Sequence, residues 1–150
     1  MTGMELKSAA FTDHGAIPQR HSGGSDDVSP PLIWSGVPEG TLELVLLCED
    51  PDAPGGSFLH WLVTGIDPRS SGVAEGERPP GGQEWPNGFG RLGWGRPMPP
   101  PGHGAHRYVF RLWAVSESLP LRGRPTVDAV HHAVQGRELA SGLLVGTYER

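Results

Sequence analysis

The stretch His106–Ser116, HRYVFRLWAVS, decides the fold class of this sequence. Successive side chains of a strand point to opposite faces of a sheet, so residues two apart share a face. Tyr, Phe, Leu and Ala at positions 108, 110, 112 and 114 fall on one face, and Arg, Val, Arg and Trp at 107, 109, 111 and 113 fall on the other. This alternation predicts a β-strand.

Other short apolar segments have the length and boundaries of strands. Leu42–Glu49, LELVLLCE, lies between Gly40 and Pro51 and predicts a strand that is buried on both faces. The sequence predicts further strands over Phe58–Asp67, around Leu32–Trp34 and over the final residues 143–150, LLVGTYER.

Only one segment has helical spacing. Val127, Val130 and Val134 recur at that spacing, Thr126 stands where a helix cap is expected, and Gly136 follows as a stop signal. One such helix among several strands predicts a mainly β protein, most simply an antiparallel Greek-key β-sandwich with one or two short helices.

Length and composition limit the classes of protein. The 150 residues fit one domain, 1–150, with a core of ordinary size. A net charge of −5 argues against binding nucleic acid or an anionic membrane surface. No segment approaches the ~20 apolar residues of a membrane-spanning helix, and the N-terminus lacks the apolar core of a signal peptide. We therefore predict a cytoplasmic protein without integral membrane association.

The sequence also limits which disulfide and metal sites the chain can form. Cys48 is the single cysteine, which excludes an intrachain disulfide and a multi-cysteine zinc site, and its apolar neighbours predict a buried core thiol. Asp50 and Asp52 are separated by a proline without a third clustered carboxylate, and His103 and His106 lack a visible third ligand. We expect neither a metal site nor a cofactor.

Residues 79–104 are more than half Gly and Pro, yet this segment also contains Trp85, Phe89 and Trp94. Flexible linkers seldom carry large aromatic side chains. The segment is therefore predicted to be a long ordered loop packed on the domain, of the kind that often carries function.

Four polar residues stand near predicted strand ends and could form a pocket. Asp50 lies in CEDPDAPGG, residues 48–56, directly after a strand, and His106 shares a strand face with Tyr108. Alternation places His60 on the face of Leu62, opposite Trp61. If Asp50, His60, His106 and Tyr108 meet, the carboxylate would orient an imidazole, raise its pKa and leave a cationic donor for an anion. The alternative, that each histidine is an isolated sheet residue, stays open because alternation does not say which strands are neighbours.

Several motifs, taken in order, resemble the phosphatidylethanolamine-binding protein family, in particular the bacterial branch related to Raf kinase inhibitor protein. The similarity extends over nearly the whole chain. It rests on IP (17–18), SPPLIWSGVP (29–38), EDPDAP (49–54), HWLV (60–63), NGFGRLGWGRPMPPPG (87–102), HRYVFRLWAV (106–115) and LVGTYER (144–150).

This resemblance implies a phosphatidylethanolamine-binding-protein-like domain with a large antiparallel sheet, a smaller sheet and a pocket for phosphate or a phospho-headgroup. It implies that Asp50, His60, His106 and Tyr108 bind the ligand and that the rim contains Asp52, Pro54, Met98, Pro99 and Pro100. It also implies a cis peptide bond between Ala53 and Pro54.

Two residues depart from the family pattern in the loop GRPMPP. Arg96 stands where the family usually has glycine, and Met98 stands where it has cysteine. We expect the Arg96 side chain to project into solvent; the alternative is a bidentate contact with the ligand's phosphate.

These observations favour a non-enzymatic binding or regulatory protein for phosphate-bearing ligands, namely a phospholipid headgroup, a nucleotide or a phosphorylated partner. The resemblance also implies inhibition of a kinase or protease as one role, and a homodimer is a further expectation. The alternative is an enzyme that uses Asp50 with His60 or His106 for acid/base hydrolysis or cyclisation. We favour the first reading because the sequence has no recognisable activated Ser or Cys nucleophile and no cofactor motif.

Overall fold

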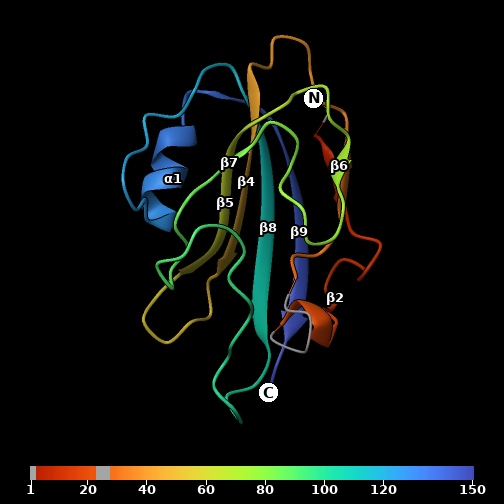
Figure 1. Ribbon diagram of the computed structural model, residues 1–150, viewed down its shortest axis with the longest axis vertical. Helices are drawn as coiled ribbons and strands as arrows, with labels where there is room; N and C mark the ends of the chain where they lie inside the picture. The colour runs from red at the N-terminus through yellow and green to blue at the C-terminus, as the bar shows by residue number, and fades with distance from the viewer. Residues whose placement is uncertain (1–2, 23–27) are drawn as a thin grey trace.

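The computed structural model describes residues 3–22 and 28–150, and within them the chain forms two β-sheets, one α-helix and a short 3-10 helix (Figure 1). The large sheet has the order β2-β9-β8-β4-β5-β7, and the small sheet has the order β1-β3-β6. All the pairings are antiparallel except that of β2 with β9. The mainly β fold with a large and a small sheet is therefore confirmed.

The bounds of the elements follow the sequence patterns for the long strands. The large sheet comprises β2 (Gly15–Ala16), β4 (Glu43–Asp50), β5 (Phe58–Ile66), β7 (Gln83–Glu84), β8 (His106–Val115) and β9 (Glu138–Tyr148). The small sheet comprises β1 (Glu5–Lys7), β3 (Leu32–Ser35) and β6 (Gly72–Val73), and the helices are η1 (Gln19–His21) and α1 (Val127–Val134). The last strand begins earlier than predicted, at Glu138.

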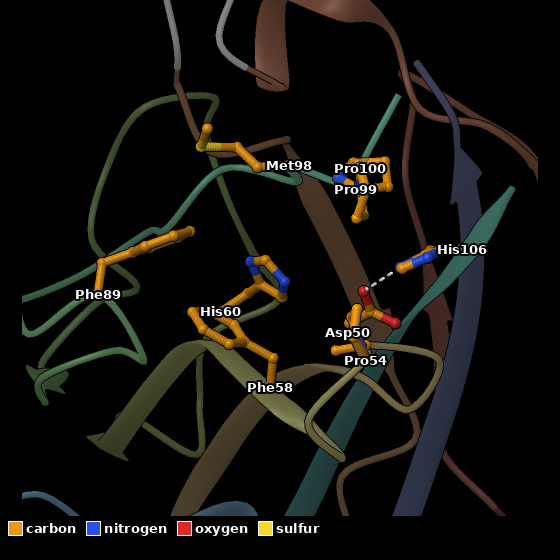
Figure 2. A pocket seen from close by; sticks show the side chains of 10 residues that line it. Asp50, Pro54, Phe58, His60, Phe89, Met98, Pro99, Pro100 and His106 are labelled. Atoms are coloured by element: carbon orange, nitrogen blue, oxygen red, sulfur yellow. Dashed lines mark hydrogen bonds and ion pairs between the residues drawn. The ribbon is translucent and has the colours of Figure 1, made fainter. Parts of the chain in front are cut away.

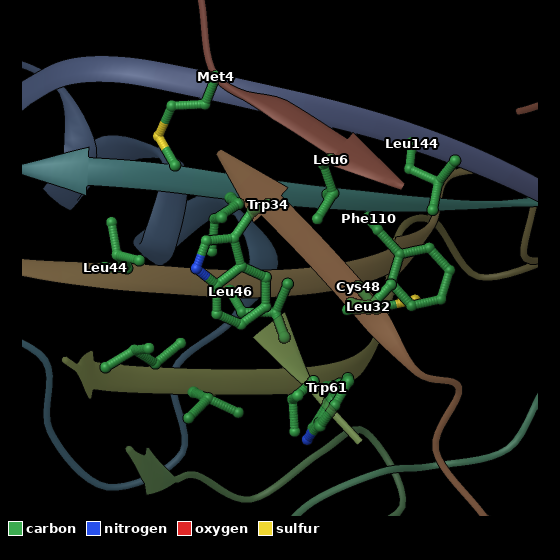
Figure 3. Close-up of a cluster of buried hydrophobic side chains, with 14 of the residues drawn as sticks. Met4, Leu6, Leu32, Trp34, Leu44, Leu46, Cys48, Trp61, Phe110 and Leu144 are labelled. Carbon is green, nitrogen blue, oxygen red and sulfur yellow. The ribbon is translucent and has the colours of Figure 1, made fainter. Parts of the chain in front are cut away.

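The main core lies between the two sheets. Figure 3 shows Leu6 and Trp34 of the small sheet packed over Leu46 and Phe110 of the large one. The predicted apolar face of β8 lies in this core, and Cys48 is fully buried within it. The burial of Cys48 confirms the predicted core thiol, and burial also raises the pKa of that thiol.

A second apolar cluster lies on the other face of the large sheet, under α1 (Figure 1). The helix places Val127, Val130 and Val134 against the sheet, as their spacing predicts. Thr126 caps the helix by accepting a hydrogen bond of 3.1 Å from the Ala129 amide, which confirms the predicted N-terminus.

The predicted cis bond between Ala53 and Pro54 is wrong, because the described residues contain no cis peptide. The Gly56 amide donates to the Ala53 carbonyl across 3.1 Å, so Pro54 occupies the second position of a four-residue turn. A proline fits that position in the trans form, whereas a turn built on a cis proline places it third.

No helix in the described ranges is long and apolar enough to cross a membrane.

Candidate functional site

A pocket of about 150 Å³ opens where β4 ends and β5 and β8 begin (Figure 2). Its polar groups come from Asp50, His60 and His106. Its other walls are apolar and consist of Ala53, Pro54, Phe58, Phe89, Met98, Pro99 and Pro100. Figure 2 shows His60 between Phe89 on one side and the Asp50–His106 pair on the other.

Strand pairing brings Asp50 and His106 together. Asp50 is the last residue of β4, His106 is the first residue of β8, and these antiparallel strands are neighbours. The His106 Nδ1–H donates to Asp50 Oδ2 over 2.7 Å, and both side chains are almost completely buried. The second Asp50 oxygen accepts from the Asp52 amide over 2.8 Å. Both carboxylate oxygens therefore have fixed partners.

His60 reaches the pocket because of a β-bulge, and the strand face predicted for it is wrong. Cys48 pairs with Trp61, but Glu49 pairs with Leu59, so His60 is an extra residue on β5. The bulge turns the imidazole to the side of Trp61 rather than that of Leu62. There it lies edge-on to the Tyr108 ring, with a centroid distance of 5.2 Å.

The protonation of His60 follows from its partners. Its Nδ1–H donates to the Gly95 carbonyl over 2.7 Å, so in the neutral ring Nε2 is a hydrogen-bond acceptor. Burial lowers the pKa of His60 to about 4, since removal from water outweighs the contact with Gly95 and the charge of Asp50. The imidazole that Asp50 orients is therefore His106, and burial favours the neutral form of His60.

His103 extends the Asp50–His106 pair towards solvent. Its Nδ1 lies 2.7 Å from His106 Nε2, a contact that needs one hydrogen between the two nitrogens. The side chain of His103 is exposed, whereas that of His106 is buried. A hydrogen-bonded chain therefore joins the surface to the pocket carboxylate. Sequence reasoning considered His103 only as a metal ligand, although its position three residues before a strand end could have indicated this contact.

Two predicted residues do not line the pocket. Tyr108 lies behind His60, fully buried, and its hydroxyl has no partner in the described residues. Burial, assisted by the negative charge of Asp50, raises the pKa of this phenol. Asp52 pairs with the Arg107 guanidinium through contacts of 2.9 and 2.8 Å, and that pairing lowers the pKa of Asp52 to about 2. Tyr108 packs against the His60 imidazole, and Asp52 fixes the turn to β8.

The long loop packs on the domain, as predicted from its aromatic residues, and forms one wall of the pocket through Phe89, Met98, Pro99 and Pro100. Phe89, and Phe58 of β5, line the pocket although neither was predicted to do so. The Gly95 amide donates to the His60 carbonyl over 2.7 Å, which fixes the loop to β5. At the other end, the Arg150 guanidinium donates to the Pro99 carbonyl over 2.7 Å. The predicted rim residues Pro54, Met98, Pro99 and Pro100 all line the pocket.

Residues 7–149 match the family model described as phosphatidylethanolamine-binding protein. The chain belongs to the phosphatidylethanolamine-binding protein family. A UPF0098 protein of Methanothermobacter thermautotrophicus is 40% identical over 152 residues, which cover 98% of this chain and 99% of the relative. A Mycobacterium tuberculosis protein named as a candidate lipoprotein, LppC, is 43% identical over 97% of this chain and 72% of its own length.

Solved structures of the phosphatidylethanolamine-binding protein family show the same fold. A family homologue from Chlamydia trachomatis superposes with a TM-score of 0.88 at 34% identity, covering 100% of this chain and 99% of the other. YbcL of E. coli, described as a member of the mammalian family, has a TM-score of 0.88 at 27% identity and 99% coverage of both chains. Because one relative is named as a lipoprotein, the cytoplasmic location stays a prediction.

Proposed function

We propose that this family member is a non-enzymatic binding protein whose pocket takes a small zwitterionic phosphate ester, such as O-phosphoethanolamine. The observation that carries the proposal is the grouping of Asp50, His60 and His106 at one side of a small pocket whose other walls are apolar. Apolar walls exclude water, which strengthens the hydrogen bonds and charge contacts that the ligand makes.

The charges in the pocket favour a zwitterion over a free dianion. Asp50 is its acidic group, and no Lys or Arg belongs to the described lining. A phosphate dianion would be repelled, whereas an ammonium group on the ligand would be attracted by Asp50 and by the faces of Phe58 and Phe89. The phosphate then lies by the imidazoles.

The acceptor on His60 favours a phosphate that still carries a proton. Because Nδ1–H is bonded to Gly95, Nε2 of the neutral ring is the nitrogen that would accept the P–OH hydrogen of a phosphate monoester. A phosphodiester, as in an intact phospholipid, has no such hydrogen and would require a cationic His60. The pocket is therefore expected to prefer monoesters at neutral pH.

The composition of the pocket supports binding rather than catalysis. The described lining residues include no Ser, Thr, Cys or Lys, and the Cys48 thiol is buried with a raised pKa. One observation favours an enzyme as the second candidate: the carboxylate of Asp50 orients the imidazole of His106 at 2.7 Å, as in acid/base pairs. Inhibition of a kinase or protease, and a homodimer, stay predictions.

Calorimetry at pH 6.5 tests the proposal with O-phosphoethanolamine, its glycerol diester and inorganic phosphate. We expect the monoester to bind most tightly, and we expect Asp50→Asn and His106→Gln to weaken it about tenfold. The first change removes the charge that attracts the ammonium group, and the second removes the imidazole that orients the Asp50 carboxylate. His132→Gln, at an exposed position of α1, is the matched control and should leave affinity unchanged. Absence of binding to wild type contradicts the proposal, and ester turnover that disappears in His106→Gln would favour the enzyme.

A further inference from the structure

A second hollow of about 310 Å³ adjoins the pocket of Asp50, His60 and His106, called the headgroup pocket, and shares Phe89 and Met98 with it. Its lining also includes Arg91 and Arg96. Arg96 is half-buried and lines this hollow, so the expectation that it simply projects into solvent is wrong.

The two hollows differ in charge. The headgroup pocket has Asp50 and no Lys or Arg among its described lining residues, whereas Arg91 and Arg96 both line the second hollow. The chain as a whole has a net charge of −5, so these two arginines make the second hollow locally more basic than the rest of the protein. A carboxylate or phosphate is the group that matches paired guanidiniums.

The backbone that carries Arg91 is fixed. The buried side chain of Asn87 accepts from the amides of Phe89 and Arg91 at 2.9 and 3.3 Å and donates to the Gly93 carbonyl at 2.9 Å. The Asn87 amide also donates to the Arg91 carbonyl at 2.7 Å. Because this backbone is already ordered in the free protein, ligand binding at Arg91 costs less conformational entropy than binding at a flexible loop would.

Arg91 is the guanidinium best placed to accept a new partner. Its side chain is exposed, and the described residues include no ion pair to it. Arg96 directly follows Gly95, whose carbonyl accepts from His60, so the second hollow is linked by one peptide unit to the imidazole of the first.

We propose that the second hollow binds a carboxylate on the same ligand, so that the paired pockets select an O-phosphoserine group over phosphoethanolamine. The ammonium and phosphate occupy the headgroup pocket, and the extra carboxylate contacts Arg91, with Arg96 contributing. This inference rests on the proposed function, because it needs the headgroup pocket to hold the phosphate ester.

Calorimetry with two probes that differ by one carboxylate, O-phosphoethanolamine and O-phospho-L-serine, tests this selectivity. Wild type should prefer phosphoserine about tenfold, since a guanidinium–carboxylate contact is charge-assisted. The preference should fall in Arg91→Gln and disappear in the double variant with Arg96→Gln, while affinity of Arg91→Gln for phosphoethanolamine stays unchanged. Arg122→Gln, an exposed arginine outside both hollows, should keep the preference.

The outcomes separate this inference from the proposed function. Equal binding of the two probes by wild type, or a preference that survives in the double variant, overturns the carboxylate subsite and leaves the headgroup pocket intact. Failure of both probes to bind overturns both proposals. Glycerophosphoserine in place of phosphoserine distinguishes the source: tighter binding of the diester indicates a lipid headgroup, and tighter binding of the monoester indicates the free amino acid.

Discussion

Raising the pH from 6 to 8 should weaken phosphoethanolamine binding about 50-fold, because the complex holds one proton more than the free protein and the fully ionised phosphate. The proton can come from two sources. With a pKa of about 4, protonating His60 at pH 7 costs about 4 kcal/mol. Protonating a phosphate monoester, whose second pKa is about 6, costs only about 1.4 kcal/mol. The ligand therefore supplies the proton to the interaction with His60 Nε2.

The size of the effect follows from the population of the ligand. About half of a monoester is singly protonated at pH 6 and about 1% at pH 8, given its second pKa of about 6. Titration calorimetry in buffers of different ionisation enthalpy measures the coupled protons directly. Uptake should rise from about one half proton at pH 6 to nearly one at pH 8.

The variant His60→Gln tests whether His60 Nε2 causes this pH dependence. A glutamine can donate an N–H to the dianion or accept from the monoanion, so its pH dependence should be much flatter. Constant affinity from pH 6 to 8 in wild type, with no proton uptake, would refute the reasoning from the Gly95 contact.

Three further predictions concern the support of the pocket. His60→Ala should lower the free energy of unfolding by about 2 to 3 kcal/mol in denaturant titrations, because a buried side chain is lost and the Gly95 carbonyl loses its donor; an unchanged midpoint would argue against this burial. Arg150→Ala should weaken ligand binding a few-fold while the melting temperature changes little, since the Pro99 carbonyl loses a hydrogen bond of 2.7 Å; unaltered affinity would show that this contact does not shape the pocket. Asp52 has a lowered pKa of about 2, so its contribution to stability is present above pH ~4 and is lost as the pH falls through 2; Asp52→Asn should reduce that acid dependence, and an identical pH profile would contradict it.

Much of this fold was predictable because its long strands carry strong patterns. The alternation of His106–Ser116 and the apolar run Leu42–Glu49 led to β8 and β4, whose meeting ends then bring Asp50 and His106 together. The two- and three-residue strands β1, β2, β6 and β7 were not predicted, since segments so short have too few residues to show a period.

The rest of the site depended on contacts that alternation does not encode. The bulge at His60 reverses its face, and it arises from pairing with β4 rather than from the local sequence. Burial then decides which side chains can reach the pocket. Tyr108 lies on the predicted face of β8, but it is fully buried behind His60 and does not line the pocket. The hollow beside Arg91 likewise depends on how the Gly/Pro loop packs on β5.

Whether this pocket binds the phosphate is tested most directly by the ¹⁵N spectrum of the imidazole rings during titration with O-phosphoethanolamine at pH 7. In the free protein His60 should show a protonated Nδ1 and a bare Nε2, as the contact with Gly95 requires. Binding should shift His60 Nε2 towards the protonated position and also move His106, while exposed His132 stays unchanged. Saturating ligand that leaves both pocket histidines unaltered, or shifts only exposed ones, would contradict the assignment of this pocket as the phosphate site.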